Sequence, residues 1–176
     1  MSTASLGPVT GYIGKRQTLL AVDDQPDQRQ MLAALLNPLG FIVREAASGS
    51  ECLDSLQNEL PDAILLDLTM DDMNGWETAK AIRQSGYTEI PIIIISANLY
   101  DNHPKKIQEA QCQAFVAKPV LESELVGVLG QFLDINWIPG GLNATDFPKN
   151  FGVSMDIAQL EIPNLSLIHI SSPRDS

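Results

Sequence analysis

The sequence has few cysteines, few basic residues and no long apolar run, and each of these absences excludes a class of protein. Its two cysteines, Cys52 and Cys112, form neither a metal-binding spacing nor a disulfide framework, and they fit a reducing, cytoplasmic setting. The longest apolar run, around Ile92–Ile95, is too short to cross a bilayer, so we expect no membrane contact by this chain. No basic and then apolar segment typical of a secretory signal opens it.

Positive charge is scarce in this chain. It has 11 Lys and Arg side chains against 22 Asp and Glu side chains, which gives a formal net charge of -11 at pH 7. Such a surface repels phosphate backbones, so we expect no direct nucleic-acid binding. The 176 residues, 44% of them hydrophobic, provide for one ordinary domain of roughly 100–150 residues and a shorter remainder.

Short apolar runs alternate with helical spacings five times between residues 18 and 133. The runs are apolar throughout, which favours strands buried on both faces of a parallel sheet that helices cover. The predicted strands are 18–22, 41–46, 63–68, 91–96 and 114–117. The predicted helices begin at Pro26, Ser48 or Ser50, Gly75, Tyr100 and Glu122. We therefore predict an α/β fold with a doubly wound, five-stranded parallel sheet.

The two flanks of this region lack a clear periodicity. Residues 1–17 contain three glycines and are predicted to form a flexible lead-in, and 18–133 form the folded domain. Residues 134–176 are predicted to be an irregular tail or linker, in which Trp137 is expected to cap the open end of the core. The last stretch, Leu165–Ser176, changes character abruptly and resembles translated sequencing-adapter read-through, so we assign it no function.

Polar side chains stand at the carboxyl ends of four predicted strands, where function collects in such sheets. They are Asp23, Asp24, Asp67, Ser96 and Lys118. Crowded carboxylates repel one another unless a cation lies among them, and hard oxygen ligands suit Mg²⁺. A carboxylate such as Asp67 can also act as a nucleophile and form an aspartyl phosphate. Ser96 and Lys118 would then hold the phosphoryl oxygens.

Four motifs in this chain together resemble the receiver domain of two-component response regulators. In chain order they are Val22-Asp23-Asp24, Leu66-Asp67, Ser96-Ala97 and Lys118-Pro119. Each motif alone is weak, but their order on five strand–helix units is specific. The resemblance covers about residues 18–133 and implies a flavodoxin-like (βα)5 fold. The flanking segments, 9–18 and 133–138, resemble those of the C-terminal receiver of a hybrid sensor histidine kinase.

The resemblance implies a role for each acidic residue of the set. Asp67 matches the phosphoacceptor, and Asp23 and Asp24 match the acidic pair that holds Mg²⁺, with Asp24 as the more direct ligand. The main-chain carbonyl of Thr69 matches the third protein ligand.

Three further positions match the residues that respond to phosphorylation. Ser96 matches the switch hydroxyl, Phe115 the switch aromatic, and Lys118 the lysine that pairs with the phosphoryl group. The resemblance also implies a cis peptide bond before Pro119.

Two positions depart from the family's pattern. The usual Met-Pro after the acceptor strand is Met70-Asp71 here, which adds a carboxylate and frees the loop backbone. The usual glycine before the fifth strand is Gln111, which is expected to strain the preceding helix end.

The resemblance implies a phosphoacceptor module in a phosphorelay rather than an enzyme. Its expected partner is a histidine kinase or a histidine phosphotransfer protein. An aspartate-based phosphohydrolase is a weaker hypothesis, because that class needs a second acid where this chain has Thr69. The alternative is a phosphate-independent docking module, as in degenerate receivers, although the intact motif set argues against it.

Overall fold

The structure, a computed structural model, describes residues 9–71 and 73–139. Its main sheet is built from β2 Thr18–Val22, β3 Ile42–Ala46, β4 Ala63–Asp67, β5 Ile92–Ser96 and β6 Ala114–Ala117. The five strands run parallel in the order β3-β2-β4-β5-β6. This order reverses beside β2, the first of them along the chain, so the doubly wound α/β fold predicted from the sequence is confirmed.

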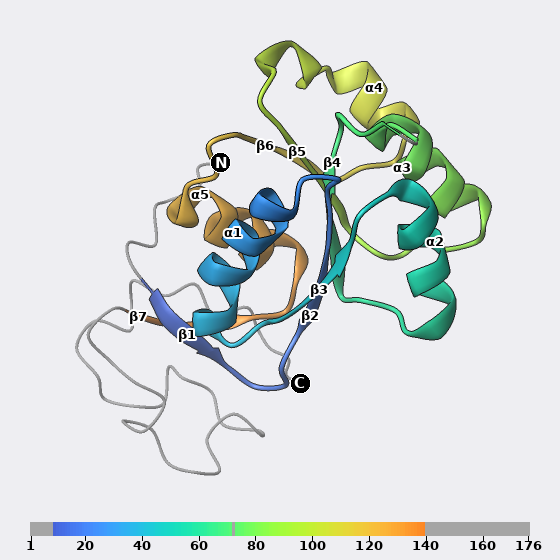
Figure 1. The fold of residues 1–176 in the computed structure, drawn as a ribbon. Coiled ribbons are helices and arrows are strands. Elements are labelled where there is room, and N and C mark those ends of the chain that lie inside the picture. Colours follow the sequence, from blue (N-terminus) through green and yellow to red (C-terminus); the bar gives the residue numbers. More distant parts are fainter. Residues whose placement is uncertain (1–8, 72, 140–176) are drawn as a thin grey trace.

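Helices cover both faces of this sheet (Figure 1). They are α1 Pro26–Leu36, α2 Gly49–Asn58, α3 Gly75–Gln84, α4 Pro104–Glu109 and α5 Glu122–Phe132, with short 3₁₀ turns at η1 Asn37–Leu39 and η2 Leu99–Asp101. The predicted helix from Tyr100 is thus divided into η2 and α4, because Pro104 favours a first helical position and begins a new helix.

Local signals in the sequence explain where the helices begin. Pro26 occupies the first turn of α1. The hydroxyl of Ser48 accepts a hydrogen bond from the Glu51 amide at 3.0 Å and caps α2. Asn74 and Glu77 form a reciprocal capping box at the start of α3. These caps satisfy amides that would otherwise lack partners, at the same edge of the sheet as the polar residues.

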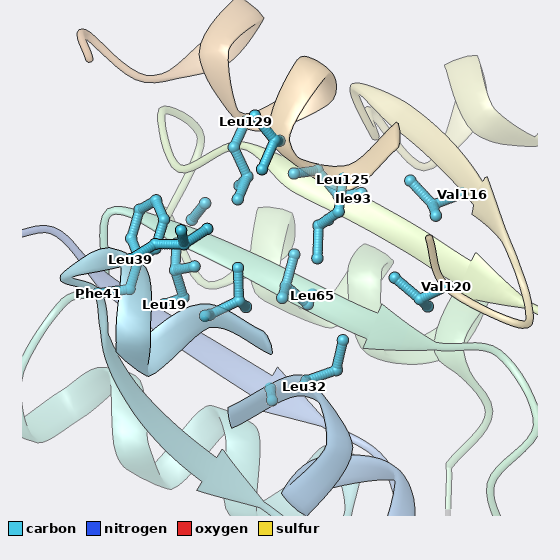
Figure 2. Packing of buried hydrophobic residues seen from close by; sticks show 14 of the residues in the cluster. Leu19, Leu32, Leu39, Phe41, Leu65, Ile93, Val116, Val120, Leu125 and Leu129 are labelled. Carbon is cyan, nitrogen blue, oxygen red and sulfur yellow. The ribbon is translucent and has the colours of Figure 1, made fainter. Parts of the chain in front are cut away.

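The core consists of two apolar layers, one on each face of the sheet. Successive side chains of a strand point to opposite faces, so Leu19 packs with α1 and α5 while Leu20 packs with α2 and α3. Figure 2 shows the first layer, in which Leu65 and Ile93 of the central strands lie below Leu125 and Leu129 of α5. Burial on both faces accounts for the continuous apolar runs of the sequence.

A second, two-stranded sheet corrects the prediction for both flanks. β1 Val9–Ile13 pairs antiparallel with β7 Asn136–Pro139, where the sequence predicted a flexible lead-in and an irregular tail. These two short strands flank the main domain in the sequence and carry no strong pattern, and each is stabilised by pairing with the other. Residues 1–8 and 140–176 of these flanks, with the segment 165–176 among them, lie outside the described residues.

Aromatic packing fixes this small sheet against the main domain. The rings of Tyr12 and Phe41 have centroids 4.8 Å apart, and Trp137 meets Phe41 edge-on at 6.0 Å. The Tyr12 hydroxyl donates to the Gly40 carbonyl at 3.0 Å and accepts from the Gln17 amide at 2.8 Å. Trp137 is buried in the first core layer, which agrees with its expected role as a cap.

Gln111 adopts the backbone conformation that its position requires. Its φ is +57°, the left-handed region that glycine occupies at no steric cost. The expectation of a strained turn between α4 and β6 is therefore correct. The carbonyl of Gln111 accepts two hydrogen bonds from the buried guanidinium of Arg83, which helps to hold this turn in place.

Candidate functional site

The carboxyl ends of the parallel strands bring the predicted residues to one edge of the sheet. Asp23 follows β2, Asp67 ends β4, Ser96 ends β5 and Lys118 follows β6. In the sheet Asp67 lies beside Ile95, and Ser96 lies beside Ala117. The strand order therefore brings together side chains that the sequence places up to 95 residues apart.

Lys118 links the two most deeply buried acids of the site. Its ammonium donates to Oδ1 of Asp67 at 3.0 Å and to Oδ2 of Asp23 at 3.2 Å. Asp67 is only 5% exposed and Asp23 only 2%. The peptide bond between Lys118 and Pro119 is cis, as the resemblance implied. Because both carboxylates are buried and share one ammonium, the charge of each group strongly affects the other two.

Three carboxylates converge at this edge and provide a set of hard oxygen donors. One oxygen from each of Asp23, Asp24 and Asp67 lies within 4.8 Å of the others. Backbone amides orient two of them, because Oδ1 of Asp23 accepts from Gln25 at 2.9 Å and Oδ2 of Asp24 accepts from Asp71 at 3.2 Å. Such an oxygen-only set fits Mg²⁺, which also keeps several water ligands.

Asp71 stands where the family usually has a proline, and its amide makes the hydrogen bond to Asp24 described above. A proline there would have no N–H and could not donate to Asp24. The loop backbone freed by this substitution therefore holds one of the three candidate ligands. Thr69, whose carbonyl the resemblance assigns to the metal, is exposed in the same loop after β4.

The site raises the pKa of both Asp67 and Lys118, but for different reasons. Burial raises the pKa of Asp67 above its ordinary value; the hydrogen bond from Lys118 opposes this, and the charges of Asp23 and Asp24 add to it. Burial alone would lower the pKa of Lys118, but its contacts with Asp67 and Asp23 outweigh burial and raise it. The site thus stabilises the charged form of Lys118, and burial together with the neighbouring carboxylates makes Asp67 easier to protonate than an aspartate in water.

We predict that Asp67→Asn raises the free energy of unfolding of the metal-free protein at pH 7 by about 1–2 kcal/mol, because it relieves this repulsion. The pKa of Asp67 is raised in the folded state, so the wild type loses stability as pH rises through the ordinary aspartate pKa toward the raised value. At lower pH both states hold the proton, and the advantage of the variant disappears.

Urea unfolding in EDTA across this pH range measures the difference between Asp67→Asn and the wild type. Asp54→Asn, on the exposed surface of α2, is the matched control and should show no such pH dependence. An advantage of Asp67→Asn that grows as pH falls would contradict the crowded-carboxylate explanation.

The two expected switch residues, Ser96 and Phe115, occupy different environments. Ser96 is 2% exposed, and its hydroxyl donates to Asp101 at 2.7 Å and accepts from the Asn98 amide at 3.1 Å. Phe115 is half-buried in β6 and packs against the second core layer. The amide of Lys118 donates to the main-chain carbonyl of Ser96 at 2.9 Å, but among the described residues no hydrogen bond joins the Ser96 hydroxyl to the side chain of Asp67 or Lys118.

Two residues of the site were not identified from the sequence. Asp101 forms the contact with Ser96 described above, and no sequence pattern indicates where its side chain points. Gly75 begins α3 directly against the end of β4, and a Cβ at that position would lie 2.5 Å from the carbonyl oxygen of Asp67. A glycine at a helix start was a usable signal, because it permits this close approach of two backbones.

Comparison with known proteins connects this geometry to a family. The model of the response regulator receiver domain matches residues 19–129. The chain is similar to the sensory/regulatory protein RpfC of Xanthomonas campestris, 32% identical over 114 residues, which are 63% of this chain and 16% of RpfC. It is also similar to the sensor histidine kinase RcsC of Escherichia coli, 33% identical over 102 residues, which are 58% of this chain and 11% of RcsC.

Solved structures give the same result for the fold. The chemotaxis protein CheY4 of Vibrio cholerae matches with a TM-score of 0.63 and 31% identity, over 68% of this chain and 100% of CheY4. The two relatives above are far longer than this chain, which spans less than one fifth of either. Within the described residues, no helix is both long and apolar enough to cross a membrane.

Proposed function

The chain belongs to the response regulator receiver family, and we propose that it accepts a phosphoryl group on Asp67 within a two-component phosphorelay. The observation that carries this proposal is the position of the Asp67 carboxylate. It is almost fully buried, 3.0 Å from the ammonium of Lys118, and close to the two other carboxylates. One lysine does not balance three converging carboxylates, and such a site is stabilised when a cation binds among them.

In the proposed reaction an Asp67 oxygen attacks the phosphorus atom of the donor. The new O–P bond forms as the bond from phosphorus to the leaving group breaks, and the leaving group keeps that electron pair. With acetyl phosphate the products are the aspartyl phosphate and acetate. Lys118 already donates to Asp67, and its charge is placed to pair with the phosphoryl oxygens that replace the free carboxylate.

Asp23, Asp24 and Asp67 are the side chains that would hold Mg²⁺, with the carbonyl of Thr69 as a further ligand. A bound Mg²⁺ would supply positive charge beside the phosphoryl oxygens. The chain's own contribution is to keep the carboxylates converged, through the amides of Gln25 and Asp71, before any donor arrives.

The proposed donor is a histidine kinase or a histidine phosphotransfer protein. The similarity to RpfC and RcsC supports a parent protein of the hybrid sensor kinase type, in which the receiver is one part of a longer chain. We place this reaction in the cytoplasm, where a kinase has access to ATP. The module accepts the phosphoryl group and does not turn over a substrate as a conventional enzyme does.

Incubation with acetyl phosphate and Mg²⁺, followed by intact-protein mass spectrometry, tests the proposal. The protein should gain one phosphoryl group, and hydroxylamine or base should remove it, because an aspartyl phosphate is an acyl phosphate. Omission of Mg²⁺ should reduce the label strongly. A label that survives base would identify a different acceptor, and the absence of any label would favour the docking module.

A further inference from the structure

The η2 turn, Leu99–Asp101, has an inverted arrangement of polar and apolar side chains. Leu99 is 68% exposed and Tyr100 is 91% exposed, whereas the side chain of Asp101 is turned inward and half-buried. A short surface turn ordinarily places its acid in water and its apolar groups inside. A specific contact therefore keeps the Asp101 carboxylate inward: its Oδ2 accepts a hydrogen bond from the Ser96 hydroxyl at 2.7 Å.

The hydroxyl of Ser96 can donate one hydrogen bond, and Asp101 accepts it. A serine hydroxyl is one donor and can accept further hydrogen bonds, and here its oxygen also accepts from the Asn98 amide. The bond to Asp101 ends on a carboxylate, which makes it stronger than a bond between neutral groups. A phosphoryl group on Asp67 would need the same proton, because its oxygens only accept.

We propose that Asp101 is a positioning residue that holds the Ser96 hydroxyl and competes with the phosphoryl group for its one proton. This inference rests on the proposed function, in which Asp67 is the acceptor. In the free protein the Ser96 hydroxyl donates to Asp101, and this hydrogen bond fixes η2 against the end of β5. When the Ser96 hydroxyl donates to the phosphoryl group instead, Asp101 loses its partner and η2 is released.

This competition links phosphorylation of Asp67 to Leu99 and Tyr100, the exposed apolar residues of η2. Asp101 holds the turn from the inside, so its release frees Leu99 and Tyr100 to adopt new positions. Coupling of this kind is reciprocal: whatever strengthens the bond between Ser96 and Asp101 weakens the phosphorylated state by the same factor.

The first measurement concerns the free protein and needs no phosphoryl group. Amide hydrogen exchange by NMR should be about tenfold faster at Asn98 and Asp101 in Asp101→Ala than in the wild type, since the loss of a charge-assisted bond frees the turn. Equal exchange rates in the two proteins would overturn the proposal, whether or not the wild type accepts phosphate.

The second measurement is a double-mutant cycle on the affinity for beryllium fluoride, which binds a carboxylate as a tetrahedral stand-in for a phosphoryl group. With Mg²⁺ present, Asp101→Ala should lower the Kd by about tenfold or more. In a Ser96→Ala background the same change should have little effect, because there is no proton to compete for. Asp101→Asn, which keeps a neutral hydrogen-bond acceptor, should have a Kd between those of the wild type and Asp101→Ala.

The cycle separates this competition from a simple change of charge. If Asp101→Ala tightens binding equally with and without the Ser96 hydroxyl, removal of a negative charge is the whole effect and the proposal is overturned. If the wild type gains no phosphoryl group and binds no beryllium fluoride, the proposed function fails. Faster exchange in Asp101→Ala would still support the holding contact in that case.

Discussion

Asp67→Ala will gain no phosphoryl group from acetyl phosphate and Mg²⁺ under conditions in which the wild type gains one. Among the described acids of the site, only Asp67 ends a central strand and also receives a hydrogen bond from Lys118 beside two other carboxylates. Asp23 shares Lys118, but its other oxygen is held by the Gln25 amide, and Asp24 lies at the half-buried rim. We therefore expect the loss to be essentially complete, at least about 100-fold in initial rate, as for removal of a nucleophile.

Intact mass and base lability measure this loss, and peptide mapping locates the label in the wild type. Asp54→Ala, which removes an exposed acid from α2, is the matched control and should be labelled as the wild type is. Circular dichroism shows whether Asp67→Ala keeps its fold. Undiminished, base-labile labelling of a folded Asp67→Ala protein would mean that another carboxylate accepts the phosphoryl group.

The main sheet could be predicted because each of its elements carries its own signal. The run from Ile92 to Ser96 is apolar enough for burial on both faces, and it ends in a polar residue at the functional edge. Pro26 and Ser48 mark helix starts, and both are where the structure begins a helix. The convergence of strand ends then follows from the topology, which explains why Asp67 and Lys118 could be placed together.

The elements that the sequence did not predict depend on partners far away in the chain. The strand at Val9–Ile13 has a glycine at its centre and no continuous apolar run, and it becomes a strand only against residues 136–139. The contact between Ser96 and Asp101 depends on the direction of two side chains in a turn, which no periodicity reports. In both cases tertiary contacts decide a structure that local propensity leaves open.

The β1–β7 pair is part of the folding unit, and Trp137→Ala is therefore expected to lower the free energy of unfolding by about 3–5 kcal/mol. Trp137 is 4% exposed and lies edge-on to both Tyr12 and Phe41. Gly130 of α5 leaves room for the indole, since a Cβ there would lie 2.8 Å from Nε1. Truncation to alanine would leave a cavity beneath the two strands and remove the largest buried side chain of β7.

Trp137→Phe is the matched variant, because the indole Nε1 has no hydrogen-bond partner among the described residues. Phenylalanine keeps most of the aromatic contact and removes that buried N–H, so it should cost roughly 1–2 kcal/mol, well below the alanine variant. Urea denaturation followed by far-UV circular dichroism measures both losses. A loss below about 1 kcal/mol for Trp137→Ala would mean that the β1–β7 pair is an appendage and that residues 18–133 fold without it.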